Sequence, residues 1–145
     1  ALADSALERF YAKWKDDAQV LEQWFSVQSA SSSYANLAHI ERLMDLSDFD
    51  LTNPNKVRSV VGAFCNQNLV HFHAKDGAGY RFLTDIILKL DALNPQIASR
   101  LMTPLTRWRK YDKERQSLLK SQLERIQANK TLSKDVREVV EKSLV

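Results

Sequence analysis

The 145-residue sequence contains little that would interrupt regular secondary structure, with only three glycines, three prolines and one cysteine. Because so few residues favour turns, we expect long regular elements joined by short connections. Alternating runs of Val, Ile and Thr are almost absent, which argues against β-strands. The lone Cys65 excludes an internal disulfide and suits a reducing compartment. No apolar run reaches the roughly 18 residues of a membrane-spanning helix, and the first ten residues lack the pattern of a signal peptide.

Apolar residues make up 44% of the chain, enough for the core of a single domain over residues 1–145. The net charge of +3 is uneven, since residues 104–125 contain seven Lys or Arg and three acidic residues. Such a segment can attract phosphate or acidic partners, and the alternative is the solvated face of a long helix. Trp108 shares a helical stripe with Ile97, Leu101 and Leu105. We therefore expect Trp108 to pack inward, which argues against a base-stacking role on nucleic acid.

Apolar residues recur every three or four positions over most of the chain, as is typical of amphipathic helices. The expected helices span about 3–15, 17–29, 33–45 and 78–92, with others starting near 54, 95 and 133. Pro104 is expected to kink or break the helix that starts near 95, and a long helix then follows to about 128. The first helix is indicated by apolar residues that recur at spacings of three and four: Leu7, Phe10, Tyr11 and Trp14.

Two helix starts are especially clear, in "TNPNK" and "LNPQI". Asn53 and Asn94 can accept hydrogen bonds from free helix N–H groups, while Pro54 and Pro95 lose nothing at the first helical position. The two starts lie 41 residues apart, close to the period of HEAT-type helix pairs. About eight helices predict an all-α fold of stacked antiparallel pairs, a HEAT/armadillo-like right-handed superhelix. A compact helical bundle is the alternative.

The segment "NLVHFHAKDGAGY" brings together two histidines and an aspartate close to the cysteine, which raises the question of a metal site. His71 and His73 are two residues apart and so do not share a helical face. Cys65 and Asp76 follow no recognised zinc-ligand spacing. We therefore interpret the segment as a capped turn, in which Asp76-Gly77 ends one element and Gly79-Tyr80 begins the next. No catalytic motif is present, and Cys65 is expected to be buried.

Polar residues at the helix starts are the remaining candidates. Gln96 and Arg100 are four residues apart and share a helical face that differs from the Ile97/Leu101 stripe. Arg58 lies one turn into its own capped helix. If the helix pairs stack in parallel, these first-turn side chains face a common space. The alternative is surface salt bridging.

Three stretches, "NPNKVRSVVGAF", "FHAKDGAGYRFL" and "LNPQIASRLMTPLTRWRKYDKERQ", resemble in order the C-terminal domain of the bacterial aminopeptidase N family, which are gluzincin-type zinc aminopeptidases. The resemblance extends over almost the whole chain. It implies that residues 1–145 are the C-terminal helical domain of a larger cytoplasmic enzyme, in keeping with a first residue that is not methionine. The zinc-binding His-Glu-x-x-His motif would lie in the catalytic domain of the parent chain, so no metal, cofactor or catalytic residue is expected here.

In that family the helical domain covers the zinc cleft and encloses a chamber that restricts access to peptides and unfolded ends. The resemblance therefore makes Arg58, Gln96 and Arg100 candidates for substrate-channel contacts. The implied partners are peptide substrates, through the parent enzyme, and the catalytic and β domains of the same chain, with no nucleic acid and no membrane. Docking onto those domains predicts an exposed apolar patch. The alternative function is a stand-alone helical-repeat scaffold that binds a protein or RNA.

Overall fold

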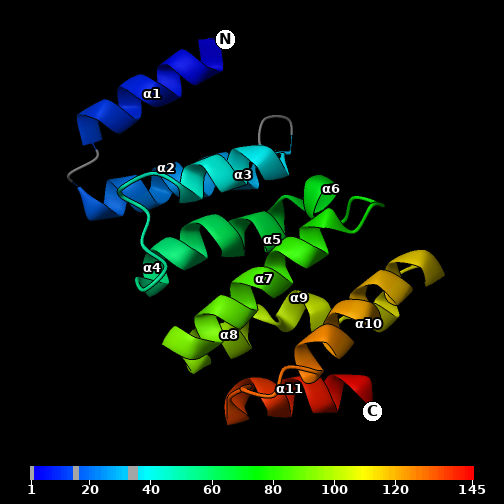
Figure 1. Ribbon diagram of the computed structural model, residues 1–145. Coiled ribbons are helices and arrows are strands. Elements are labelled where there is room, and N and C mark those ends of the chain that lie inside the picture. Colours follow the sequence, from blue (N-terminus) through cyan, green and yellow to red (C-terminus); the bar gives the residue numbers. More distant parts are fainter. Residues whose placement is uncertain (1, 15–16, 33–35) are drawn as a thin grey trace. The chain divides into compact units, whose positions relative to one another are not determined.

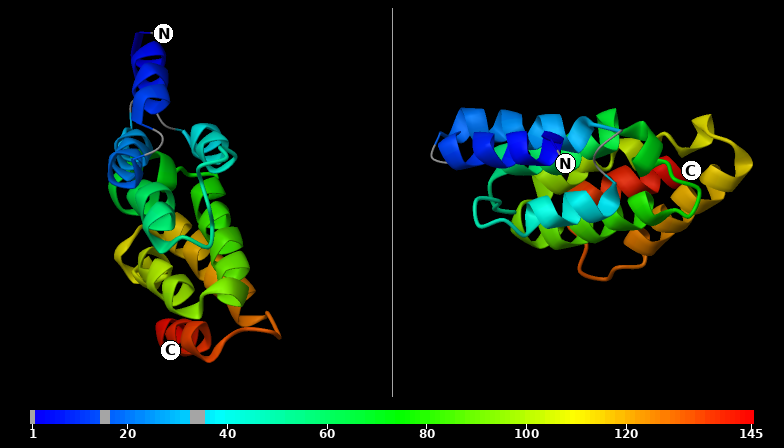
Figure 2. Two further views of the ribbon diagram at one scale, coloured as in Figure 1. Left: turned by 90° about the vertical axis from the view of Figure 1, so that its left-hand side faces the viewer. Right: turned by 90° about the horizontal axis from the view of Figure 1, so that it is seen from above.

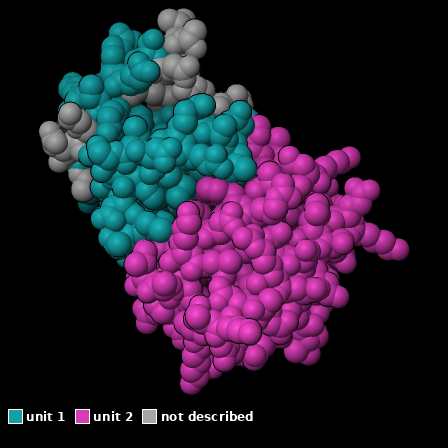
Figure 3. All heavy atoms as spheres, in the orientation of Figure 1, with its two compact units in different colours: residues 1–68 teal, residues 69–145 magenta. Residues whose placement is uncertain are grey.

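The computed structural model describes residues 2–14, 17–32 and 36–145, and every regular element in these ranges is a helix (Figure 1). The predicted all-α fold is therefore confirmed. The chain divides into two compact units, residues 1–68 (unit 1) and residues 69–145 (unit 2), which Figure 3 colours separately. The expectation that residues 1–145 form one domain stays a prediction. None of the described helices is long and apolar enough to cross a bilayer.

Unit 1 begins with α1 (Leu2–Trp14) and α2 (Ala18–Ala30), which run antiparallel and pack together (Figures 1 and 2). After α3 (Leu37–Met44), one helix continues from residue 54 to residue 67 in three sections: α4 (Pro54–Val57), a wider π-helical turn η1 (Arg58–Gly62) and α5 (Ala63–Gln67). Both α2 and α3 pack against this helix, which forms the centre of the unit. The core side chains are Leu21, Phe25, Ile40, Val57, Val60, Val61 and Phe64. Of the apolar residues that indicated the first helix, Phe10 and Trp14 are exposed, and Leu7 lies outside the side chains that the structure describes.

Unit 2 contains the short helix α6 (Leu69–Phe72) and the long helix α7 (Ala78–Leu93), followed after a single residue by α8 (Pro95–Leu101). The rest of the unit is α9 (Thr103–Thr106), the 3-10 turn η2 (Trp108–Lys110), α10 (Lys113–Gln127) and α11 (Lys134–Leu144). α7 packs against α8 and α10, while α11 packs against α8 and α10. The core side chains include Tyr80, Leu83, Ile87, Leu90, Leu105, Leu119 and Leu123.

The helix caps expected from the sequence are confirmed. The side-chain oxygen of Asn53 accepts from Asn55 N at 3.0 Å, and that of Asn94 accepts from Ile97 N at 3.3 Å. Ser133 caps α11 in the same way. These contacts satisfy N–H groups that have no partner inside the helix.

The expectation of one long helix between Pro104 and residue 128 was wrong. α8 ends at Leu101, α9 spans only one turn around Pro104, and η2 separates it from α10, which begins after the cap Asp112. Trp108 provides the physical reason, because it is buried as predicted and its indole N–H donates to Ser143 O at 3.0 Å. This contact holds the chain in a turn there instead of a continuing helix.

Candidate functional site

An open groove of about 640 Å³ lies on unit 1 between α2 and the start of the residue 54–67 helix. Most of its lining side chains are polar: Gln19, Glu22, Gln23 and Ser26 come from α2, and Asn55, Arg58 and Ser59 from the other helix. Ligand sites in proteins commonly occupy about 300–1,000 Å³. The groove is therefore large enough for a short peptide, and it contains Arg58, the first of the three predicted site residues.

The helix start holds Arg58 at this groove. Asn53 caps the helix, and Asn55 in its first turn accepts a hydrogen bond from the guanidinium of Arg58. The π-helical turn begins at Arg58, whereas Val57 and Val60 on either side are fully buried. A π turn interrupts the ordinary helical period. Arg58 is therefore exposed although Val57 and Val60 beside it are buried.

The groove has one negative and one positive side chain, Glu22 and Arg58. The ion pairs found among the described residues join Arg115 to Asp112 and Arg125 to Asp85, so Glu22 and Arg58 do not pair with each other. A guanidinium offers parallel donors to a carboxylate, and the neighbouring amides offer both donors and acceptors to a peptide main chain. These groups suit binding of a peptide.

A second, apolar pocket of about 350 Å³ lies between α1 and α2. It is lined by Ala6, Phe10 and Trp24 together with Gln23 and Val27, which also line the polar groove. Phe10 and Val27 are 40% and 66% exposed, which is high for large apolar side chains. Docking of this chain onto further domains predicts an exposed apolar patch of this kind.

Gln96 and Arg100 lie in unit 2, where both are exposed on α8. Ile97 and Leu101 on the same helix are buried, so the predicted division of α8 into a polar and an apolar face is confirmed. Since Arg58 belongs to unit 1, the expectation that all three residues face a common space stays a prediction. Their expected role in a substrate channel also stays a prediction.

The stretch with two histidines forms the end of α6 and the turn into α7. His71 lies in α6 and His73 follows it, while Cys65 belongs to unit 1, where it is 2% exposed and burial raises the pKa of its thiol. Within the described ranges, no group of three His, Cys, Asp or Glu side chains is placed to hold a metal ion. The turn itself is built as predicted: Asp76 accepts from Ala78 N at 3.0 Å, and Gly77 has a left-handed backbone with φ of 73°.

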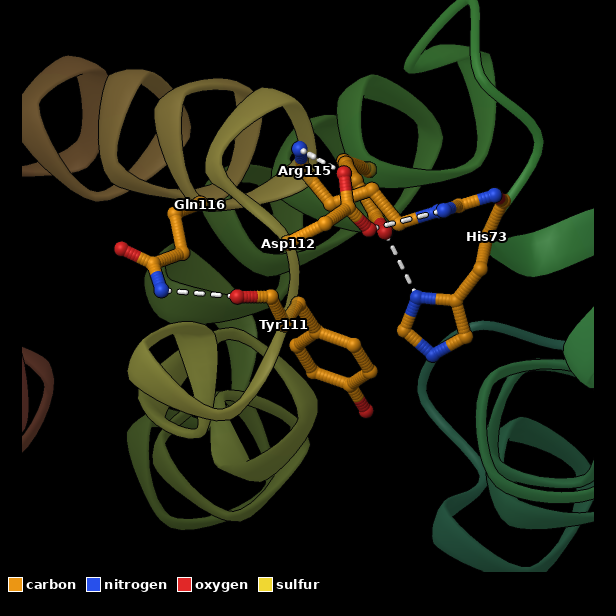
Figure 4. A network of polar contacts seen from close by, with 6 residues as sticks. His73, Tyr111, Asp112, Arg115 and Gln116 are labelled. Atoms are coloured by element: carbon orange, nitrogen blue, oxygen red, sulfur yellow. Dashed lines mark hydrogen bonds and ion pairs between the residues drawn. The ribbon is translucent and has the colours of Figure 1, made fainter.

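His73 has a structural role that the sequence did not reveal. Figure 4 shows its ring beside that of Tyr111, with the ring centroids 4.6 Å apart. The carbonyl of His73 accepts from Arg115 Nε at 3.0 Å. Arg115 in turn pairs with Asp112 at 2.8 Å. The network therefore ties the α6–α7 turn to the start of α10.

The protonation of His73 follows from these neighbours. Burial, and then the nearby positive charge of Arg115, lowers the pKa of His73. Burial raises the pKa of Tyr80 to about 12, and its hydroxyl is hydrogen-bonded to Nδ1 of His73 at 2.6 Å. His73 and Arg115 are 42 residues apart, so no local spacing rule could have paired them. The one sequence signal was the position of Arg115 three residues after the cap Asp112.

Comparison with known proteins places the chain in a family. The family described as "Domain of unknown function (DUF3458_C) ARM repeats" matches residues 1–145. Aminopeptidase N of Haemophilus influenzae and that of Caulobacter vibrioides are each 45% identical over 97% of the chain, and aminopeptidase N of Escherichia coli is 37% identical over the same share. The chain spans 16% of the length of each of these relatives.

A solved structure shows the same similarity in three dimensions. Legionella pneumophila aminopeptidase A, crystallised in complex with aspartic acid, superposes with a TM-score of 0.90 and 41% identity. The match covers 98% of this chain and 16% of that one. The chain therefore belongs to the DUF3458_C family of ARM-repeat domains, and it is homologous to the C-terminal domain of aminopeptidase N.

Proposed function

We propose that this chain is the non-catalytic C-terminal helical part of a cytoplasmic zinc aminopeptidase that removes N-terminal residues from peptides. The observation that carries the proposal is the 37–45% identity to aminopeptidase N over 97% of the chain, at only 16% of the relatives' length. Identity at this level over a whole domain supports a shared role within the parent enzyme. The catalytic and β domains of that parent are then the chain's partners.

The residues that the structure describes do not fit a zinc site. The described side chains offer no group of three ligands, and the single cysteine is buried in α5 with a raised thiol pKa. Zinc needs three or four ligands in fixed geometry. In the proposal, zinc is bound elsewhere in the parent chain, and this part contributes no catalytic step.

Its contribution is to enclose the active-site chamber and to select substrates by access. Arg58, Gln96 and Arg100 are the proposed contacts to peptides in the channel. The exposure of all three side chains supports this role, because exposed polar groups can bind main-chain amides and carboxylates. The exposed apolar side chains of Leu69 and Val70 support docking of this part onto other domains.

The Arg100→Ala variant of the parent enzyme tests the substrate-channel role. We expect KM to rise about two- to fivefold over a series of peptides with little change in kcat, because an exposed contact contributes up to about 1 kcal/mol. Such a pattern identifies lost binding rather than lost chemistry. The Arg107→Ala variant, at an exposed arginine outside α8, is the control. An unchanged KM over the whole peptide series contradicts the role.

The gene itself tests the origin of the chain. The proposal predicts that a His-Glu-x-x-His motif precedes the codon for Ala1 in the same reading frame. A start codon directly before Ala1 would instead support a stand-alone helical-repeat scaffold that binds a protein or RNA.

A further inference from the structure

We propose that the polar groove and the apolar pocket of unit 1 form one two-part site for a peptide with a free C-terminal carboxylate and a nearby large apolar side chain. Arg58 receives the carboxylate, and the pocket between α1 and α2 receives the side chain. This inference deepens the proposed function and rests on it for the source of such peptides. It assigns a peptide-end site to α2, a helix that contains none of the residues singled out from the sequence.

The two cavities are neighbours, because Gln23 and Val27 line both of them. Gln19 and Gln23 lie four residues apart on α2, so they form one row of side chains that lines the polar groove. Trp24 and Val27 are three residues apart and form the neighbouring row, which faces the apolar pocket. A ligand that crosses the Gln23/Val27 ridge therefore contacts both cavities.

The charges at the polar end select the class of ligand. Arg58 is the single cationic side chain of the lining, and Glu22 lies on the opposite wall. A phosphate dianion would bring its second charge near Glu22, whereas a carboxylate has one charge and matches the fork of a guanidinium. Arg58 has five N–H donors, and its hydrogen bond to Asn55 uses one of them.

The uncharged lining matches a peptide rather than a simple carboxylic acid. Gln19, Gln23 and Asn55 each have an amide that can donate to a main-chain carbonyl and accept from a main-chain N–H. At the other end, Phe10 and Val27 offer apolar surface that is still in contact with water, while Trp24 closes the floor at 7% exposed. Covering such surface with an apolar side chain is favourable by about 25 cal/mol per Å².

Titration of the ¹⁵N-labelled chain by NMR tests the site with defined probes. The probes are alanine tetrapeptides with one Phe at each of the last three positions, each made as the free acid and as the C-terminal amide. We expect the best acid to bind about tenfold more tightly than its amide, since a charge-assisted contact contributes about 1.5–3 kcal/mol. The shifted amides should lie in α1, α2 and the first turn after Asn53.

Variants separate the two ends of the site. Arg58→Ala should remove the preference for acid over amide, and Arg58→Lys should retain only part of it because lysine lacks the bidentate fork. Arg107→Ala is the matched control and should keep the full preference. Phe10→Ala should weaken the binding of the Phe-containing peptides severalfold and leave the binding of tetra-alanine unchanged. Circular dichroism verifies that each variant is folded.

Three results would overturn the inference: equal binding of acid and amide, an acid preference that survives in Arg58→Ala, or shifts confined to unit 2. A fourth result combines two measurements: no peptide binds to the chain, and α1 and α2 are protected from hydrogen exchange in the parent enzyme. That result would assign this face to contact with another domain. The proposed function is tested separately, through KM of the parent enzyme with Arg100→Ala. Each of the two proposals can therefore fail without the other.

Discussion

At Gly79 the fold of unit 2 leaves no room for a side chain. A Cβ at this position would lie 2.9 Å from both the Cα and the carbonyl carbon of Phe72, and still closer to the carbonyl oxygen. These are backbone atoms of α6, which packs directly on the start of α7. The close approach of α6 to α7 therefore requires glycine.

We predict that Gly79→Ala lowers the free energy of unfolding by about 2 kcal/mol, because the backbones of α6 and α7 must move apart. Gly62→Ala is the matched control, since the nearest atom to its Cβ, on Arg58, is 3.9 Å away. That variant should be neutral or stabilising by up to about 1 kcal/mol, because alanine favours a helix. Urea unfolding followed by circular dichroism measures both changes. Equal effects of the two substitutions would show that the Phe72 contact does not constrain the fold.

His73 makes the stability of unit 2 depend on pH. Its pKa in the folded chain lies below the ordinary 6.5, first because of burial and then because of Arg115. The unfolded chain therefore binds a proton more readily than the folded chain does. The contribution of neutral His73 to stability is fully present above the unfolded pKa, near 6.5, and is lost as pH falls through the lower folded pKa.

We expect the free energy of unfolding to decrease between about pH 7.5 and pH 5 in the unmodified chain. Protonated His73 would meet the positive charge of Arg115, which itself pairs with Asp112. Tyr80 and Tyr111 are the other polar side chains in contact with His73. His73→Gln should reduce this pH dependence, and His71→Gln should retain it. Urea titrations at several pH values distinguish the two variants. The same pH profile in His73→Gln and in the unmodified chain would assign the effect to other groups.

At the scale of helices, the α11 cap differs from the other caps because it is linked to a buried charge. Asp91 is 8% exposed, and its carboxylate accepts from Ser133 N at 2.8 Å and also from the Ser133 hydroxyl. Ser133 Oγ meanwhile accepts from Val136 N at 3.2 Å. One side chain thus caps α11 and partners a carboxylate of α7.

We therefore predict that Ser133→Ala destabilises the chain more than Asn94→Ala does. Asn94→Ala should cost about 1 kcal/mol, the usual effect of removing an N-cap. Ser133→Ala should cost about 2–3 kcal/mol, because it also removes a donor from the buried Asp91 carboxylate. Denaturant unfolding of both variants gives the comparison. Equal losses would mean that Asp91 gains nothing from the Ser133 hydroxyl.

The helices could be predicted from sequence where the determining interactions are local. The starts at Asn53, Asn94 and Ser133 and the interruption at Pro104 follow from cap chemistry and ring geometry within a few residues. The π-helical turn at residues 58–62 and the turn at Trp108 were not predictable. The Trp108 turn depends on the distant Ser143, and the π-helical turn lies among side chains packed from α2 and α3.

At the scale of the whole molecule, the candidate site was predicted only in part. Arg58, Gln96 and Arg100 were identified as polar residues at helix starts, and the structure confirms that all three are exposed. The groove beside Arg58 was not predicted, because its other wall comes from α2, more than 30 residues earlier in the chain. Sequence spacing identifies which side chains share one helix, but it does not say which helices pack together.

In the proposed function, this chain controls which peptides reach the active site of its parent enzyme. The most direct measurement compares the parent with its Arg58→Ala, Gln96→Ala, Arg100→Ala triple variant on a series of peptides and on a single-residue aminoacyl amide. The account predicts a higher KM for the peptides, about fivefold or more, with kcat and the hydrolysis of the small amide unchanged. Unchanged kinetics on every substrate, or an equal loss on peptides and on the small amide, would contradict it.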